Sequence, residues 1–137
     1  MSDTANKPVH KRLPEWLKIR LPQNKKFFEL KSLVQKYKLN TVCESASCPN
    51  IGACWDAGTL TFMILGDTCT RACRFCDVPT GNLSTPNPDE PREIAQTLSK
   101  LNLRYVVITS VDRDDLKDGG ADHWVQTIQL TVTNVHK

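Results

Sequence analysis

Apolar residues recur at helical spacing in three segments of the chain, and each segment predicts a helix that buries one face. The first follows Asn24, which suits a helix N-cap, and covers residues 25–38. The second begins after Asp89 and ends near Asn102, and the third follows Gly120. The three apolar stripes are Phe27, Leu30, Val34 and Tyr37, then Ile94, Leu98 and Leu101, then Ala121, Trp124, Val125 and Ile128.

Two short apolar runs, rich in β-branched and aromatic residues, predict buried strands at residues 59–65 and 105–109. The resulting order of strand, loop, helix, strand, loop and helix is typical of right-handed βαβ units and a parallel sheet. We therefore expect an α/β fold that forms the start of an incomplete (β/α) barrel, since a whole barrel needs about 200 residues or more.

Three regions are expected along the chain. Residues 1–58 form a cysteine-bearing extension of helices and loops, residues 59–129 form the first two βα units, and residues 130–137 form an atypical tail that loses the helical spacing. Two strands leave a parallel sheet short of cover, so we expect the chain on its own to be poorly folded and inactive. The residues expected to lack cover are Phe62, Ile64, Val106 and Ile108.

The composition, 39% hydrophobic and 24% charged over 137 residues, is typical of a soluble globular protein. The sequence shows neither an apolar run long enough for a membrane span nor a secretory signal, so we expect a cytoplasmic protein that binds no membrane. Residues 1–42 contain ten Lys or Arg against three Asp or Glu. Such a basic segment can attract nucleic acid, but Lys7, Lys11 and Arg12 alternate with prolines rather than with aromatic residues, which favours a solvated arm without nucleic acid.

Six cysteines without a secretory signal favour metal binding or catalysis over disulfides. Three of them form a C-x3-C-x2-C motif directly after the first strand, where parallel α/β folds place their chemistry. Three thiolates on one tight loop suit a cubane cluster and leave one iron open for a small molecule. Arg71 and Arg74 can offset the negative charge of a cluster, and Phe75 can shield it from water. This downstream triad consists of Cys69, Cys73 and Cys76.

The other three cysteines lie before the first strand with C-x4-C-x5-C spacing. This upstream triad consists of Cys43, Cys48 and Cys54. Two compact triads separated by one strand predict two clusters. Structural zinc, including one site shared by both triads, is the alternative, but zinc sites commonly pair C-x2-C knuckles and only Cys73 and Cys76 have that spacing.

The C-x3-C-x2-C motif that ends in Phe75-Cys76 resembles the signature of the radical S-adenosylmethionine (SAM) superfamily. The contexts Val42-Cys43-Glu44 and Cys48-Pro49-Asn50 of the upstream triad are similar to the lipoyl synthase family within it. Further similar runs are Thr68-Cys69-Thr70-Arg71, Cys76-Asp77-Val78 and Thr109-Ser110-Val111-Asp112-Arg113-Asp114-Asp115-Leu116. The resemblance covers approximately residues 7–129, and the Arg-Ser-Ser-Tyr motif that supplies a serine ligand in that family does not occur in this sequence.

The resemblance implies a partial radical SAM barrel with two [4Fe–4S] clusters. The downstream triad would hold the cluster that binds SAM, whose one-electron cleavage gives a radical that abstracts hydrogen from C6 and C8 of an octanoyl chain. The upstream triad would hold the cluster that donates sulfur. The implied partners are an octanoylated lipoyl-carrier domain and a low-potential electron donor such as flavodoxin or ferredoxin.

Thr109 and Ser110 follow the second strand, where the resemblance implies contact with the SAM amine; simple loop capping is the alternative. His10, His123 and His136 show no ligand spacing, and His123 is expected to be a surface or packing residue. Two other interpretations stay open. One is another sulfur-inserting radical SAM enzyme such as biotin synthase, which the upstream triad disfavours, and the other is a zinc-binding interaction module.

Overall fold

The computed structural model describes residues 14–15, 18, 22, 24–101 and 103–135. The basic arm predicted from Lys7, Lys11 and Arg12 lies outside these residues, as do His10 and His136. The elements are α1 (Lys25–Lys36), α2 (Val42–Ser45), α3 (Ile51–Asp56), β1 (Thr59–Ile64), α4 (Glu90–Lys100), β2 (Tyr105–Ser110) and α5 (Ala121–Val135). The three predicted helices and both predicted strands are therefore present, and α2 and α3 occupy the cysteine-bearing extension.

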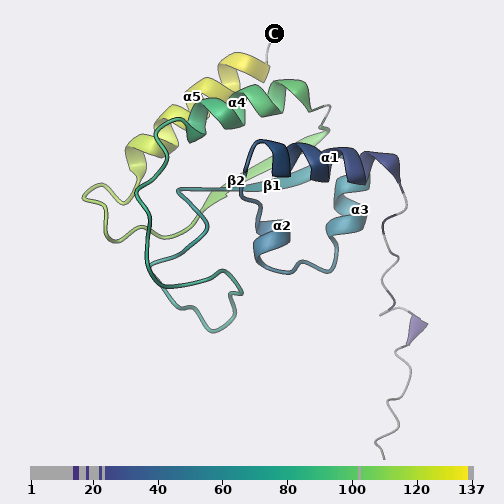
Figure 1. Cartoon of the computed structure of the whole chain (residues 1–137), viewed down its shortest axis with the longest axis horizontal. Coiled ribbons are helices and arrows are strands. Elements are labelled where there is room, and N and C mark those ends of the chain that lie inside the picture. The colour runs from purple at the N-terminus through teal and green to yellow at the C-terminus, as the bar shows by residue number, and fades with distance from the viewer. Residues whose placement is uncertain (1–13, 16–17, 19–21, 23, 102, 136–137) are drawn as a thin grey trace, which may run out of the picture.

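The two strands pair in parallel, from Thr59 opposite Tyr105 to Ile64 opposite Ser110. A parallel pair needs a crossover connection, and α4 supplies it between the strands. Figure 1 shows α4 and α5 lying side by side along the sheet, with α1, α2 and α3 gathered near β1. This arrangement confirms the predicted α/β fold with the beginning of a (β/α) unit series.

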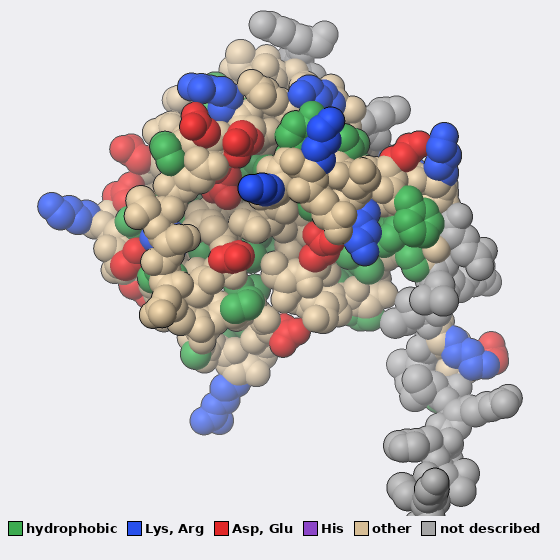
Figure 2. Space-filling model, viewed as in Figure 1, with side chains coloured by type: hydrophobic (Ala, Val, Ile, Leu, Met, Phe, Trp, Pro, Cys, Tyr) green, Lys and Arg blue, Asp and Glu red, His purple; other side chains and the backbone are tan. Residues whose placement is uncertain are grey.

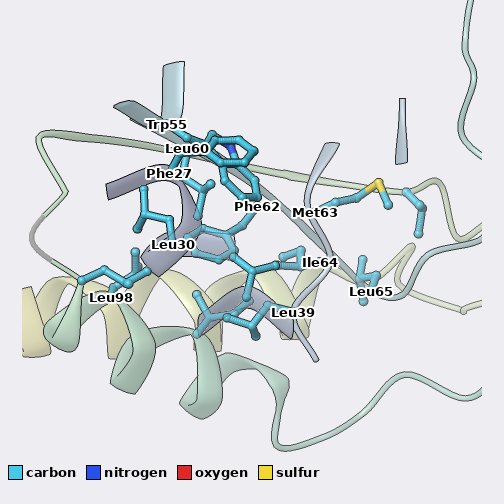
Figure 3. Packing of buried hydrophobic residues seen from close by; sticks show 14 residues of the cluster. Phe27, Leu30, Leu39, Trp55, Leu60, Phe62, Met63, Ile64, Leu65 and Leu98 are labelled. Atoms are coloured by element: carbon cyan, nitrogen blue, oxygen red, sulfur yellow. The ribbon is translucent and has the colours of Figure 1, made fainter. Parts of the chain in front are cut away.

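The extension before β1 is folded onto that strand rather than separate from it. The amide of Met63 donates to the carbonyl of Asn40 at 2.9 Å, and Thr41 forms an antiparallel bridge with Phe62. These contacts cover the edge of β1 that β2 does not pair with. The ring of Phe27 on α1 lies 5.3 Å from that of Trp55 on α3, which closes the top of the same apolar cluster (Figure 3).

One buried cluster joins residues of α1, β1 and α4, so the prediction that Phe62 and Ile64 lack cover is wrong. Both side chains are 0% exposed, as is Leu60. The reason is that α1 contributes Leu30 and Val34 to the same cluster, a second layer that counting strands alone could not reveal. On β2, Val106 and Ile108 are half-buried and pack against the cluster. The exposed apolar side chains of β2 are instead Tyr105 and Val107.

The helix α5 continues to Val135, beyond residue 130, where the helical spacing of the sequence is lost; the boundary of the atypical tail stays a prediction. The hydroxyl of Thr133 donates to the carbonyl of Gln129 at 2.7 Å, and Thr127 does the same to His123 at 2.8 Å. A hydroxyl that donates to the main-chain carbonyl one turn earlier has its hydrogen bond satisfied within the helix. The polar, β-branched residues that weaken the helical spacing are thus accommodated without ending the helix.

After β1 the chain makes a sharp turn at Leu65 and Gly66, which have φ angles of 70° and 107°. Leu65 has only 1% of its surface exposed. Its amide donates to a carboxylate oxygen of Glu90 on α4 at 2.8 Å, and its carbonyl accepts from Arg113 at 2.9 Å. Both main-chain groups of Leu65 are therefore satisfied by side chains from other parts of the fold. No helix of the described residues is long and apolar enough to cross a membrane.

The packing of Gly120 against Leu65 gives a testable prediction. A Cβ at Gly120 would lie 2.4 Å from Cδ1 of the buried Leu65, whereas one at Gly119 meets no atom within 4 Å. Both glycines have positive φ, 91° and 62°. We expect Gly119→Ala to lower the free energy of unfolding by about 1–2 kcal/mol through backbone strain alone. Gly120→Ala should lose about a further 1–3 kcal/mol through overpacking.

Urea unfolding followed by circular dichroism measures both variants. Equal losses for the two variants would contradict the packing of Gly120 on Leu65.

Candidate cluster-binding loops

The downstream triad lies on the loop that follows the Leu65 turn. Cys69 is half-buried, and its amide donates to the carbonyl of Pro79 at 2.9 Å, which closes the base of the loop. Cys73 and Cys76 are exposed, with the amide of Cys76 bonded to the carbonyl of Cys73 at 3.0 Å. Phe75 is 93% exposed, so it shields none of these thiols in this arrangement.

The sulfur of Cys69 accepts two main-chain hydrogen bonds. The amide of Arg71, on its own loop, approaches at 3.5 Å, and the amide of Asp112, on the loop after β2, approaches at 3.3 Å. In addition, the amide of Thr70 donates to the carbonyl of Asp112 at 3.1 Å. Since parallel strands end at the same edge of a sheet, the loops after β1 and β2 meet there and share these bonds.

A bidentate ion pair fastens the two loops together. Arg71 donates from Nε and Nη2 to the two oxygens of Asp114 at 2.8 and 2.7 Å, and Thr70 donates to the same carboxylate at 3.0 Å. The hydrogen bonds from Arg71 and then Thr70 lower the pKa of Asp114 below its usual range. The bond to Asp114 and the nearby Asp112 raise the pKa of Arg71. From the sequence, Arg71 was predicted only to offset the charge of a cluster, and its partner Asp114 was not predicted; the acidic loop after a parallel strand was the one available signal, and it is too general to specify the pair.

A second arginine holds the base of the same loop. Arg113 is 3% exposed and donates from Nε and Nη2 to the carboxylate of Asp115, both at 2.8 Å. It also donates to the carbonyls of Leu65 and Ser84, at 2.9 and 3.1 Å. The neighbouring guanidinium lowers the pKa of Asp115. Arg113 thus joins the loop after β2 to two points of the connection between β1 and α4, Leu65 and Ser84.

Thr109 and Ser110, the predicted SAM contacts, are both half-buried at the end of β2. The indole Nε1 of Trp124 donates to the hydroxyl oxygen of Ser110 at 3.1 Å. His123 lies beside it on α5 and contacts Glu90 at 2.7 Å. His123 is therefore a packing residue, as expected. The contact of Trp124 with Ser110 was not predicted, because the helical spacing of Trp124 indicated only a core position.

The upstream triad is distributed over α2, the following loop and α3. Cys43 lies on α2, which begins at the N-cap Thr41, and Cys54 lies on α3. The amide of Cys48 donates to the carbonyl of Cys43 at 3.1 Å and so turns the chain back. All three thiols are half-buried, and Cys43 and Cys54 pack against the apolar cluster.

The described residues contain no group of three or more Cys, His, Asp or Glu side chains already arranged to hold a metal ion. The donor chemistry nevertheless fits iron–sulfur clusters, because all six cysteines are free thiols and lie in two sets of three. Metal sites of this kind commonly form together with the bound metal rather than before it. The assignment of the six cysteines as ligands stays a prediction.

Comparisons with known proteins match both parts of the chain. The family model for the N-terminal domain of lipoyl synthase matches residues 2–48, and the radical SAM superfamily model matches residues 63–129. The chain is 56% identical over 124 residues to a lipoyl synthase of Neisseria meningitidis serogroup C, an alignment that covers 89% of the chain and 38% of the relative. The chain thus matches the N-terminal portion of lipoyl synthases.

Other lipoyl synthases are equally similar to the chain. A lipoyl synthase of Flavobacterium johnsoniae is 55% identical over 116 residues, with 85% of the chain and 40% of the relative covered. One of Laribacter hongkongensis is 55% identical over 118 residues, covering 86% and 38%. The chain thus spans about two fifths of the length of these relatives. The match to the radical SAM superfamily implies an iron–sulfur cluster and SAM.

The ion pair between Arg113 and Asp115 predicts how stability depends on pH. A carboxyl group whose pKa is lower in the folded state stabilises the fold above its unfolded pKa of about 4 and loses that contribution as the pH falls through the folded value. We expect Asp115→Asn to lower stability at pH 7 and to flatten the decline below about pH 4. The control, Asp89→Asn, breaks an exposed pair with Arg92 and should change little.

Thermal unfolding of the metal-free chain between pH 7 and 3 makes the comparison. Parallel pH profiles for wild type and Asp115→Asn would show that this pair does not hold the loop.

Proposed function

We propose that this chain is part of a radical SAM sulfurtransferase that inserts sulfur at C6 and C8 of a protein-bound octanoyl group to form the lipoyl cofactor. The observation that carries the proposal is the pair of cysteine triads on two separate loops of a chain that is about 55% identical to lipoyl synthases. Two cluster loops are what a reaction needs when one cluster generates a radical and the other supplies sulfur.

Cys69, Cys73 and Cys76 would hold the cluster that binds SAM. When bound, this cluster and SAM supply the one-electron chemistry that activates a carbon–hydrogen bond. The chain's own residues fix the geometry around it. Cys69 sits where two loops meet, and Ser110, two residues before Asp112, lies with Thr109 at the same edge of the sheet. We assign these two residues to SAM binding, with Phe75 free to fold over the cluster.

The hydrogen bond between Trp124 and Ser110 supports this assignment of Ser110. An indole N–H can only donate, so the oxygen of Ser110 is the acceptor for Trp124. The second lone pair of that oxygen then remains available to accept from the SAM amine. Trp124 would therefore set the direction in which Ser110 accepts.

A second cluster would be held by Cys43, Cys48 and Cys54, and this cluster would be the sulfur source. The enzyme would then contain two [4Fe–4S] clusters. The half-buried positions of these three cysteines on α2, the following loop and α3 suit a cluster that must be reached by a carbon chain yet protected from water. Because β1 separates the two loops in sequence and α2 contacts β1, the fold can keep both clusters in one molecule.

The proposed substrate is the octanoylated lysine of a lipoyl-carrier domain in the cytoplasm, and a low-potential protein such as flavodoxin or ferredoxin would supply electrons. Figure 2 shows Lys and Arg side chains interspersed with Asp and Glu on the face in view. A nucleic-acid partner would favour a surface of one sign. The face in view offers no surface of one sign for nucleic acid.

Removing one triad at a time tests whether the downstream triad serves SAM cleavage and the upstream triad serves sulfur donation. In a chimera, residues 1–129 of this chain replace the matching segment of the Neisseria meningitidis relative. Replacing Cys43, Cys48 and Cys54 by Ala should leave about half the iron and preserve SAM cleavage, but abolish lipoyl-lysine, because only the sulfur donor is lost. Iron assay, detection of 5′-deoxyadenosine and mass spectrometry of the carrier provide the three readouts.

The matched control replaces Cys69, Cys73 and Cys76 by Ala, which should also leave about half the iron but abolish SAM cleavage. Normal lipoyl formation by the first variant would refute the proposal. A colourless wild-type protein that contains zinc would favour the zinc-binding module instead.

A further inference from the structure

We propose that Asp114, through its paired hydrogen bonds with Arg71, is a positioning residue that holds the Asp112 amide against the sulfur of Cys69 and thereby sets the reduction potential of the cluster on the downstream triad. The inference rests on the proposed function only in requiring that this triad binds an iron–sulfur cluster. It assigns a role to the loop after β2, which carries no cysteine.

The ion pair fixes both the distance and the orientation between the loops. The guanidinium of Arg71 bonds both oxygens of Asp114, at 2.7 and 2.8 Å, and such a planar fork defines a geometry that a lysine cannot reproduce. Thr70 strengthens the arrangement in both directions. Its hydroxyl donates to the carboxylate of Asp114 at 3.0 Å and accepts the amide of Asp114 at 3.3 Å.

Two residues before Asp114, the main chain faces the cysteine loop. The carbonyl of Asp112 accepts from the amide of Thr70 at 3.1 Å, and its amide donates to the sulfur of Cys69 at 3.3 Å. Cys69 is half-buried, while Cys73 and Cys76 are exposed. Its sulfur is therefore the one of the three at which a protein hydrogen bond is least replaced by water.

Hydrogen bonds to ligand sulfur atoms are one of the factors that set the potential of an iron–sulfur cluster. An amide that donates to sulfur favours the reduced cluster, which carries more negative charge, and so raises the reduction potential. An exposed ion pair contributes little to stability by itself. The role of Asp114 is thus geometric: losing the pair should let Asp112 move away from Cys69 and lower the potential.

The test must not change the net charge near the cluster, because a charge shifts the potential directly. We would therefore use the double variant Arg71→Gln/Asp114→Asn and the single variant Arg71→Lys. The matched control is Arg92→Gln/Asp89→Asn, which removes an exposed pair on α4. All are made in the 137-residue chain with Cys43, Cys48 and Cys54 replaced by Ala, reconstituted anaerobically with iron and sulfide.

Redox titration followed by electron paramagnetic resonance measures the fraction of reduced cluster. Poised at the midpoint of the parent chain, the double variant should show a several-fold lower ratio of reduced to oxidised cluster, Arg71→Lys a smaller decrease and the α4 control no change. A double variant that titrates with the parent at full iron content would overturn the proposal.

If the double variant loses its circular dichroism signal, Arg71→Lys decides by the same titration. It keeps the charges and removes the paired hydrogen bonds to Asp114, so a lowered potential supports the proposal and an unchanged one overturns it. The titration uses neither octanoyl substrate nor carrier. A failure to form lipoyl-lysine would count against the proposed function and leave this result intact.

Discussion

The turn at Leu65 is the constraint on which the arrangement of the loops depends. A non-glycine residue with a φ of 70° is strained, so the surrounding structure must hold it. Glu90 binds its amide, Arg113 binds its carbonyl, and Gly120 leaves room for its side chain. These three residues come from α4, the loop after β2 and the start of α5. The turn that precedes the cysteine loop is therefore fixed only when both βα units are folded.

This dependence links packing to the proposed chemistry. Arg113 and Asp114 are neighbours in sequence, and they secure different ends of the cysteine loop: Arg113 holds Leu65 at its beginning, and Asp114 holds Arg71 within it. The sulfur of Cys69 lies between these attachments and bonds to Asp112. A displacement of the loop after β2 would therefore change the hydrogen bond to the sulfur of Cys69, although that loop carries no cysteine.

Local signals predicted most of the fold, whereas contacts between distant segments explain what was missed. The spacing around Phe27 and Ile94 identified α1 and α4, because each helix buries a single stripe. The cover of Phe62 was not predictable, since it depends on how α1 packs across β1. The cysteine spacings identified both candidate loops, and the order of elements placed one at the sheet edge. The partnership of Arg71 with Asp114 joins residues 43 positions apart, and no local pattern specifies it.

Hydrogen exchange at the amide of Leu65 tests the central claim, that side-chain bonds hold this turn before any metal binds. Measured by nuclear magnetic resonance on the metal-free chain, the Leu65 amide should exchange as slowly as the strand amides of Phe62 and Ile64, because Glu90 binds it in the buried interior. Glu90→Ala should release it selectively. Exchange of the wild-type Leu65 amide as fast as that of the exposed Asp67 would contradict the account.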